Sequence, residues 1–359
     1  MSAQAELEIV AAGAYASIQD GGRRGYRRIG VPWAGVLDRS LMRIANALAG
    51  NAEDAPVVEC FDGGLQVVAC GGAVRVAVAG DAGVEVEDRD GRRNVPSWRS
   101  VTLAEGERLR IRRLTSGRIA VVAVAGLAVP AVMGSASTYV RARLGGLDGS
   151  ALVAGARLPA GVVDGVDRVL PQPPSSDTGP IRIVPGPQAG HFTDEALQTL
   201  LSAEFRVTAE ADRMGVRLEG PRLAHRGTAE IVSDATVPGS IQVPGNGQPI
   251  VLLADAQTAG GYPKIATVIS ADLGRLAARR PGQGLRFAAV SAIEGERIAR
   301  AFEAETRSLI ASIRPLLPDG IDLAALSGAN LVGGVVHALA PEYRPQPSDH
   351  AADARSPHR

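Results

Sequence analysis

Glycine and proline recur along the whole chain and limit the length of any regular element. The 359 residues include 43 glycines and 23 prolines, two residue types that interrupt helices and strands and favour turns. The apolar segments between them alternate or are rich in β-branched residues, as strands are, most clearly at residues 74–79, 108–112 and 118–124. The sequence therefore predicts a body of many short strands joined by turns.

Two predicted helices and a linker divide this strand-rich sequence. Residues 40–48 place apolar side chains on one helical face and follow Asp38, a favourable N-cap. Residues 193–201 predict a second helix, with Thr193 as its cap. Between them, residues 171–180 have the proline-rich composition of a linker. Each half thus shows one helix among many strands, which favours two closed or nearly closed β-barrel units.

These patterns give a prediction of the domain organisation. We expect an N-terminal β-barrel domain over residues 1–175 and a C-terminal one over residues 176–300. Apolar residues keep a roughly helical spacing after residue 294, which predicts a helical extension over residues 301–340. Residues 341–359 are polar and proline-rich, as expected of a disordered tail.

Charge and cysteine content argue against several protein classes. The chain carries 38 basic and 38 acidic residues, so nothing in its net charge favours a nucleic-acid or membrane partner. Cys60 and Cys70 match no metal-binding spacing, and two free thiols fit a reducing cytosol. Residues 1–10 lack the basic region of a signal peptide, and the longest apolar run, residues 119–133, is too short to span a bilayer. We therefore expect a cytoplasmic protein.

One basic residue differs from all the others. Of the 38 basic residues, only Lys264 is a lysine and the remainder are arginines. A lysine ammonium is compact and sits on a flexible stem. Its pKa falls when it is buried, which an arginine guanidinium cannot reproduce. Lys264 lies in a glycine-rich turn, residues 260–267, that opens onto an apolar run. Its retention marks a candidate site residue, and the alternative is that it survived by drift.

Polar residues and glycines gather in three clusters, at residues 17–39, 134–146 and 211–264. Glycines let backbone N–H groups approach a ligand, and nearby Gln, Asp, Arg and Lys side chains supply directional contacts. The sequence contains no P-loop, no HExxH metal motif and no GxSxG nucleophile elbow. Its histidines are too scattered to suggest a metal site.

The third cluster supplies the candidate catalytic residues. Gln242, Asp255 and Lys264 converge on one apolar, glycine-rich segment, where we expect Lys264 to line a concave pocket. Candidate substrate-binding residues are Ser135, Ser137, Gln248, Gly261 and Tyr262. We expect a further group of charged residues to hold tight turns through Asp–Arg pairs, or to support the site in another way. These residues are Asp20, Arg23, Asp38, Asp212 and Arg213.

Three runs within these clusters, residues 17–26, 212–220 and 238–264, resemble the biotin-dependent carboxyltransferase family. The family includes allophanate hydrolase subunit 2-like proteins, the C subunit of bacterial 5-oxoprolinase and part of the carboxyltransferase region of urea carboxylase. The resemblance covers residues 5–295 and implies a mainly β fold with a few helices, in two cyclophilin-like β-barrel domains. The chain departs from the family pattern at Ala211, where a small hydroxyl residue is usual.

Within this family, the resemblance to the C subunit of 5-oxoprolinase implies an ATP-dependent amidohydrolase complex that opens the small molecule 5-oxoproline to glutamate. Separate A-like and B-like subunits would be its partners, with ATP a cofactor at the level of the complex. Lys264 would then stabilise negative charge that develops on the lactam carbonyl oxygen. Gln242 would orient the ring amide, and Asp255 would orient Lys264 or handle a proton.

Two alternatives stay open. In one, the chain is the carboxyltransferase component of a biotin-dependent urea or amide carboxylase. Biotin would be carried by a separate protein, and Lys264 would stabilise its enolate or position the carboxylate. In the other, the chain is a non-catalytic regulatory subunit that binds and controls a partner. Since the sequence offers no recognisable nucleophile–base pair, we expect an active site shared with a partner subunit.

Overall fold

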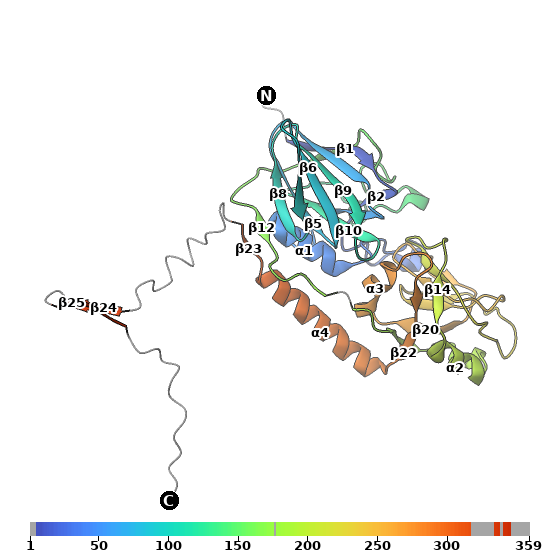
Figure 1. The fold of residues 1–359 in the computed structure, drawn as a ribbon. Helices are drawn as coiled ribbons and strands as arrows, with labels where there is room; N and C mark the ends of the chain where they lie inside the picture. The colour runs from blue at the N-terminus through green and yellow to red at the C-terminus, as the bar shows by residue number, and fades with distance from the viewer. Residues whose placement is uncertain (1–4, 176, 317–333, 338–339, 346–359) are drawn as a thin grey trace, which may run out of the picture. The chain divides into compact units, whose positions relative to one another are not determined.

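The computed structural model describes residues 5–175 and 177–316, together with the backbone of two short strands further along the chain. The described residues up to Pro315 belong to one compact unit (Figure 1). The two further strands lie in a separate unit and pair in an antiparallel hairpin, β24 (Gly334–His337) with β25 (Ala340–Pro345). Most of the predicted tail lies outside the described residues.

Two sheets form the first half of the compact unit (residues 5–175) and enclose a common apolar core. In the first sheet alternate side chains are buried, as Leu65, Val67 and Ala69 are along one strand, so one face packs inward. Across this sheet the strands follow the order β11 (Arg157–Pro159), β1 (Glu6–Ala12), β4 (Leu65–Cys70), β9 (Arg108–Leu114), β6 (Ala82–Glu87) and β7 (Arg92–Pro96).

The second sheet is covered on both faces. Its central strands, β10 (Ile119–Val124) and β5 (Val74–Ala79), are buried at every residue, because one face meets the common core and a helix covers the other. Near-continuous apolar runs are the expected sequence of such strands. The order across the sheet is β2 (Tyr15–Gln19), β3 (Val57–Phe61), β10 (Ile119–Val124), β5 (Val74–Ala79), β8 (Arg99–Leu103), β12 (Arg168–Val169) and β23 (Arg314–Pro315).

The helix on this sheet is α1 (Arg39–Ala49), which begins where the sequence predicts. The Asp38 carboxylate accepts a hydrogen bond from the backbone N–H of Ser40 (2.9 Å), so it is the N-cap. A cap of this kind typically stabilises a helix by about 1 kcal/mol. Ile44 and Leu48 lie on the buried face and belong to the apolar cluster that α1 forms with the sheet.

The second half (residues 177–289) is built around one large sheet and α2 (Asp194–Ser202). The predicted cap of this helix is confirmed, since Thr193 Oγ1 accepts a hydrogen bond from the N–H of Ala196 (3.1 Å). The order across the sheet is β21 (Gly284–Leu285), β14 (Phe205–Val207), β15 (Gly215–Glu219), β18 (Ile250–Leu252), β17 (Ser240–Gln242), β20 (Lys264–Val268), β13 (Ile181–Pro185) and β22 (Phe287–Ala289).

Short elements connect the sheets, and one long helix follows them. They are η1 (Arg27–Ile29), η2 (Val140–Ala142), η3 (Ala189–His191), η4 (Ser270–Asp272), α3 (Leu273–Ala277), α4 (Ala292–Ala311) and the two-stranded sheet of β16 (Asp234–Ala235) and β19 (Ala259–Gly260). Helix α4 packs against α1 of the first half (Figure 1) and against β13 and η4 of the second.

The mainly β fold with few helices is confirmed, and the two halves share part of their packing. Leu37, Phe61 and Ile119 of the first half belong to the apolar core of the second. The described residues of the predicted linker, 171–175 and 177–180, contain no helix or strand. The cyclophilin-like character of each barrel and the domain boundaries stay predictions.

Candidate functional site

Lys264 is the first residue of β20, and its side chain is turned inward. The side chain is 2% exposed, and Nζ donates to Asp234 Oδ2 at 2.8 Å. Asp234 belongs to the short strand β16 and its own side chain is 50% exposed. The ammonium is therefore covered by a carboxylate that lies at the surface.

Gln188 ties these two residues together. Its Oε1 accepts a hydrogen bond from the backbone N–H of Lys264 (3.0 Å), and its Nε2 donates to Asp234 Oδ2 (2.8 Å). The hydrogen bonds from Lys264 and Gln188 lower the pKa of the Asp234 carboxyl below its usual value. Asp234 is thus held as a carboxylate next to the ammonium.

Gln242 lies opposite Lys264. The two residues are paired across β17 and β20, next to an irregularity in the ladder. The Gln242 side chain is buried; its Oε1 accepts from Gln257 Nε2 (3.2 Å) and its Nε2 lies 3.5 Å from the Tyr262 carbonyl oxygen. A Cβ at residue 260 would come within 2.4 Å of Gln242 Nε2. Glycine at this position therefore makes room for the amide.

Asp255 belongs to a different buried cluster, centred on Arg213. Its two carboxylate oxygens accept from Arg213 Nε and Nη2, both at 3.0 Å. Arg213 also contacts the Glu59 carboxylate and donates to the Gly35 carbonyl oxygen (2.6 Å). The structure thus pairs Lys264 with Asp234 rather than with Asp255, since both oxygens of Asp255 already face a guanidinium.

The Arg213 cluster joins the two halves through buried charges. Glu59 is a β3 residue of the first half, fully buried, and burial raises the pKa of its carboxyl. Burial also opposes the charge on Arg213, but Asp255 and Glu59 outweigh it and raise the pKa of the guanidinium. Two carboxylates around one guanidinium, with extra backbone hydrogen bonds, satisfy the conditions for a stable buried ion pair.

The turn residues of the first cluster do not form the expected Asp20–Arg23 pair. Asp20 instead accepts hydrogen bonds from the hydroxyls of Ser135 and Ser137, each at 2.6 Å. Arg23 is buried and donates to backbone carbonyls, including that of Ser137 (2.8 Å). The hydroxyls and carbonyls of residues 132–137 take the place of the expected partner charges. Both serines are buried in this network.

Two of the remaining predicted residues, Asp212 and Gln248, form hydrogen bonds with the backbone. Asp212 Oδ1 accepts from the N–H of Met214 (2.8 Å), so it holds the turn and does not pair with Arg213. Both ends of the Gln248 amide bind the backbone of Gly220, at 2.9 and 3.0 Å. Tyr262 is 41% exposed near Lys264. A substrate-binding role for these residues stays a prediction.

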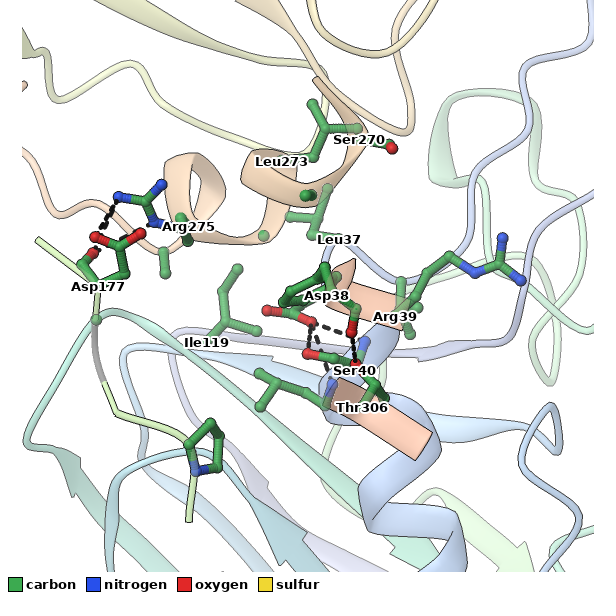
Figure 2. A pocket seen from close by; sticks show the side chains of 18 of the residues that line it. Leu37, Asp38, Arg39, Ser40, Ile119, Asp177, Ser270, Leu273, Arg275 and Thr306 are labelled. Carbon is green, nitrogen blue, oxygen red and sulfur yellow. Dashed lines mark hydrogen bonds and ion pairs between the residues drawn. The ribbon is translucent and has the colours of Figure 1, made fainter. Parts of the chain in front are cut away.

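A groove of about 1160 Å³ lies between the two halves and α4. Figure 2 shows Leu37, Asp38 and Ile119 on one side and Leu273 and the Asp177–Arg275 ion pair (3.1 Å) on the other. Of the predicted site residues, only Asp38 lines it, where it caps α1. The groove is therefore separate from the Lys264 cluster.

Three residues of the Lys264 and Arg213 clusters were not predicted, namely Gln188, Asp234 and Glu59. Glu59 carries a recognisable signal, since it is an acid within a run of apolar residues in a strand. Asp234 lies in a two-residue strand among exposed residues, and no local pattern indicates its partner. In the described part of the chain, no cluster of His, Cys, Asp and Glu side chains could hold a metal ion. Nor is any described helix long and apolar enough to cross a membrane.

Comparison with known proteins places this architecture in a family. The family model described as "Carboxyltransferase domain, subdomain A and B" matches residues 29–289. The C subunit of 5-oxoprolinase from Escherichia coli (strain K12) is 38% identical over 296 residues, covering 78% of this chain and 90% of that protein. Urea amidolyase of Saccharomyces cerevisiae is 30% identical over 79% of this chain, but the match spans 17% of that protein.

A solved structure shows the same fold. The crystal structure of the Kluyveromyces lactis urea amidolyase superposes with a TM-score of 0.77, over 86% of this chain and 20% of that one, at 23% identity. The family match contains β15, β17 and β20, and with them Arg213, Gln242 and Lys264. On the breadth of the family match and its identity to the E. coli protein, this chain belongs to the carboxyltransferase domain, subdomain A and B, family.

Proposed function

We propose that this chain is the C subunit of an ATP-dependent 5-oxoprolinase, a complex that opens the lactam of 5-oxoproline to give glutamate. One observation carries the proposal: the 38% identity to the C subunit of E. coli 5-oxoprolinase extends over 90% of that protein. The Haemophilus influenzae protein of the same name is 36% identical over 95% of its length. The likeness therefore covers nearly the whole of both relatives, not one shared segment.

The Lys264 cluster suits the chemistry of lactam opening. Attack on an amide carbonyl places negative charge on its oxygen, and a cation within hydrogen-bond reach stabilises that charge. Lys264 would supply the cation, and the Gln242 amide, opposite it on β17, would orient the ring amide. Asp255 would act at a distance, through the position of Arg213, rather than on Lys264 directly.

The complex would supply what this chain does not offer. Lactam hydrolysis also needs a nucleophile and the coupling to ATP, and we assign both to the complex with its A-like and B-like partners. ATP would then be a cofactor of the assembly. The free thiols Cys60 and Cys70 agree with a cytoplasmic complex, because thiols persist in that compartment.

The test is to reconstitute the complex from this chain and separately purified A-like and B-like subunits. Glutamate should form from 5-oxoproline and ATP when all three proteins are present, and the rate should fall to background when this chain or ATP is omitted. The chain alone should be folded and inactive. Full activity without this chain, or no activity in any combination that co-purifies, would refute the proposal.

Carboxyl transfer is the second candidate, favoured by the family model and by the 30% identity to S. cerevisiae urea amidolyase. In this reaction Lys264 would stabilise the enolate of biotin on a separate carrier, or position its carboxyl group. The same reconstitution distinguishes the two candidates. Bicarbonate-dependent carboxylation of urea with a biotinylated carrier, and no glutamate from 5-oxoproline, would select carboxyl transfer.

A further inference from the structure

We propose that residues 231–235 form a strap that must move away before Lys264 can act, and that Asp234 is the positioning residue that holds the ammonium until it does. The inference rests on the proposed role of Lys264. The two members of the ion pair differ in solvent exposure: the Lys264 side chain is 2% exposed, whereas that of its partner Asp234 is 50% exposed. The partner lies on the solvent side of the ammonium.

The ammonium has three N–H donors, of which Asp234 accepts from one. The Lys264 side chain is 2% exposed, so a substrate cannot reach the ammonium from solvent in this arrangement. A group that stabilises a developing oxyanion has to come within about 2.7–3.1 Å of it. Nζ of Lys264 already donates to Asp234 at 2.8 Å, and Asp234 lies on the outer side. A substrate oxygen can reach Nζ once Asp234 has moved, so access to the lysine requires movement of the strap.

The strap has few attachments. Its strand β16 pairs with β19 at two positions, Asp234 with Gly260 and Ala235 with Ala259. The N–H of Ile231 donates to the Gly261 carbonyl oxygen (2.8 Å). Between these points the side chain of Val232 is 92% exposed. Short exposed pairings with little buried apolar surface belong to the low-stability end of a structure.

The residue after the strap is fixed much more firmly. Thr236 is buried, and its hydroxyl donates to the Gln257 carbonyl oxygen (2.5 Å). Arg27 of the first half donates to the backbone carbonyl of Thr236. The strap therefore has a firmly anchored end at Thr236 and a more weakly held span before it, which places the hinge between residues 235 and 236.

Movement of the strap would separate the two charges and break the hydrogen bond from Gln188 Nε2 to Asp234, but it would leave Lys264 in place. Asp234 would leave with the strap, whereas Gln188 would still hold Lys264 through its backbone N–H (3.0 Å). The ammonium would then have lost its carboxylate partner. The open state therefore favours binding of a group with negative or partial negative charge, such as a lactam carbonyl oxygen.

A reversible cross-link tests the strap. A Cβ at residue 261 would lie 3.9 Å from Ser233 Oγ and meet nothing closer than 3.4 Å, so Ser233→Cys with Gly261→Cys can form a disulfide after a small adjustment. Cys70→Ser removes the more accessible of the two native thiols. Lys264 is the chain's one lysine, so its acetylation can be followed by mass spectrometry in the purified full-length chain.

The oxidised double variant should acetylate Lys264 at least about tenfold more slowly than its reduced form, because the strap can no longer open. The reduced form should match the Cys70→Ser parent, and the single Ser233→Cys variant should not respond to oxidant. Equal acetylation of Lys264 in the oxidised and reduced forms would overturn the proposal. In the reconstituted complex, oxidation should abolish the activity that the reduced variant has, and a reductant should return it to that same level.

Asp234→Asn gives a second measurement that needs no cross-link. It removes the charge that holds the ammonium, and acetylation of Lys264 should rise by about fivefold or more. The matched control is Asp194→Asn. Asp194 lies on α2 and forms an exposed ion pair with Arg226, so this variant should leave acetylation unchanged. An unchanged rate in Asp234→Asn would contradict the proposal. The acetylation results stand whether or not the complex acts on 5-oxoproline, so the strap and the proposed function can fail separately.

Discussion

Gln242 and Lys264 lie directly opposite each other across the antiparallel pair of β17 and β20, beside an irregularity in the ladder. Residues opposite each other in an antiparallel pair share one face of the sheet, so the amide and the ammonium are presented together. A register shift of one residue would move them to opposite faces. The pairing of these two strands therefore determines whether the proposed site exists.

Gly260→Ala should displace Gln242 while leaving the fold intact. The new Cβ would lie 2.4 Å from Gln242 Nε2, so the buried amide has to move. Overpacking of this kind costs about 1–3 kcal/mol, and a shift of about 1 Å at a site can reduce activity about 100-fold. Urea denaturation and steady-state kinetics of the reconstituted complex would measure the two effects.

Gly227→Ala is the matched control for this substitution. Its Cβ would have no atom within 4 Å apart from its chain neighbours, so stability should stay within about 0.5 kcal/mol of wild type. If both alanine variants behave alike, the position of the Gln242 amide does not matter to activity.

Arg213→Met should destabilise the chain strongly. It would leave the Glu59 and Asp255 carboxylates buried without their cation, and breaking a buried ion pair on one side costs about 3–5 kcal/mol. Arg217→Met removes an exposed pair with Glu210 and should change stability by less than about 0.5 kcal/mol. Chemical denaturation compares the two variants. A loss below about 1 kcal/mol for Arg213→Met would show that the cluster does not hold the halves together.

The environment of Asp272 predicts that the free energy of unfolding falls at acid pH. Burial opposes its charge, but hydrogen bonds and ion pairs with Arg182 and Arg275 outweigh burial and lower the pKa of its carboxyl. A lowered pKa in the folded state adds stability above the ordinary Asp value of about 3.9, and this stability is lost as the pH falls towards the lower folded value.

Asp272→Asn should therefore be less stable than wild type at pH 7, and the difference should shrink as the pH falls below about 4. The free energy of unfolding measured from about pH 7 to about pH 2.5 would check this. A difference between the two proteins that stays constant over this range would mean that Asp272 has the same pKa in the folded and unfolded chains.

Local sequence patterns predicted the helices because their signals are local. Asp38 and Thr193 cap α1 and α2 through hydrogen bonds to residues two or three positions away, and apolar periodicity marks the buried face of α1. The runs at residues 74–79 and 118–124 likewise correspond to the buried strands β5 and β10. In each case the contacts that make the segment a helix or a strand lie within the element itself or on its buried faces.

The partners of the charged residues could not be predicted in the same way. Asp255 meets Arg213 from 42 positions away, and Glu59 meets it from 154. Such contacts depend on how the two halves pack, which no local spacing encodes. Lys264 and Gln242 are candidates from the sequence because Lys264 is the one lysine and both lie in a cluster of glycines and polar residues. The sequence carries no such sign of Asp234, whose two-residue strand forms only by pairing with β19.

The rate of glutamate formation from 5-oxoproline and ATP by a complex that carries Lys264→Arg tests the central claim most directly. Arginine keeps the positive charge but changes its shape and reach, so the variant should assemble normally and lose activity by about 10²–10³-fold, as when a main electrostatic donor is removed. A rate equal to that of the wild-type complex would contradict the account, because Lys264 would then have no special part in the reaction.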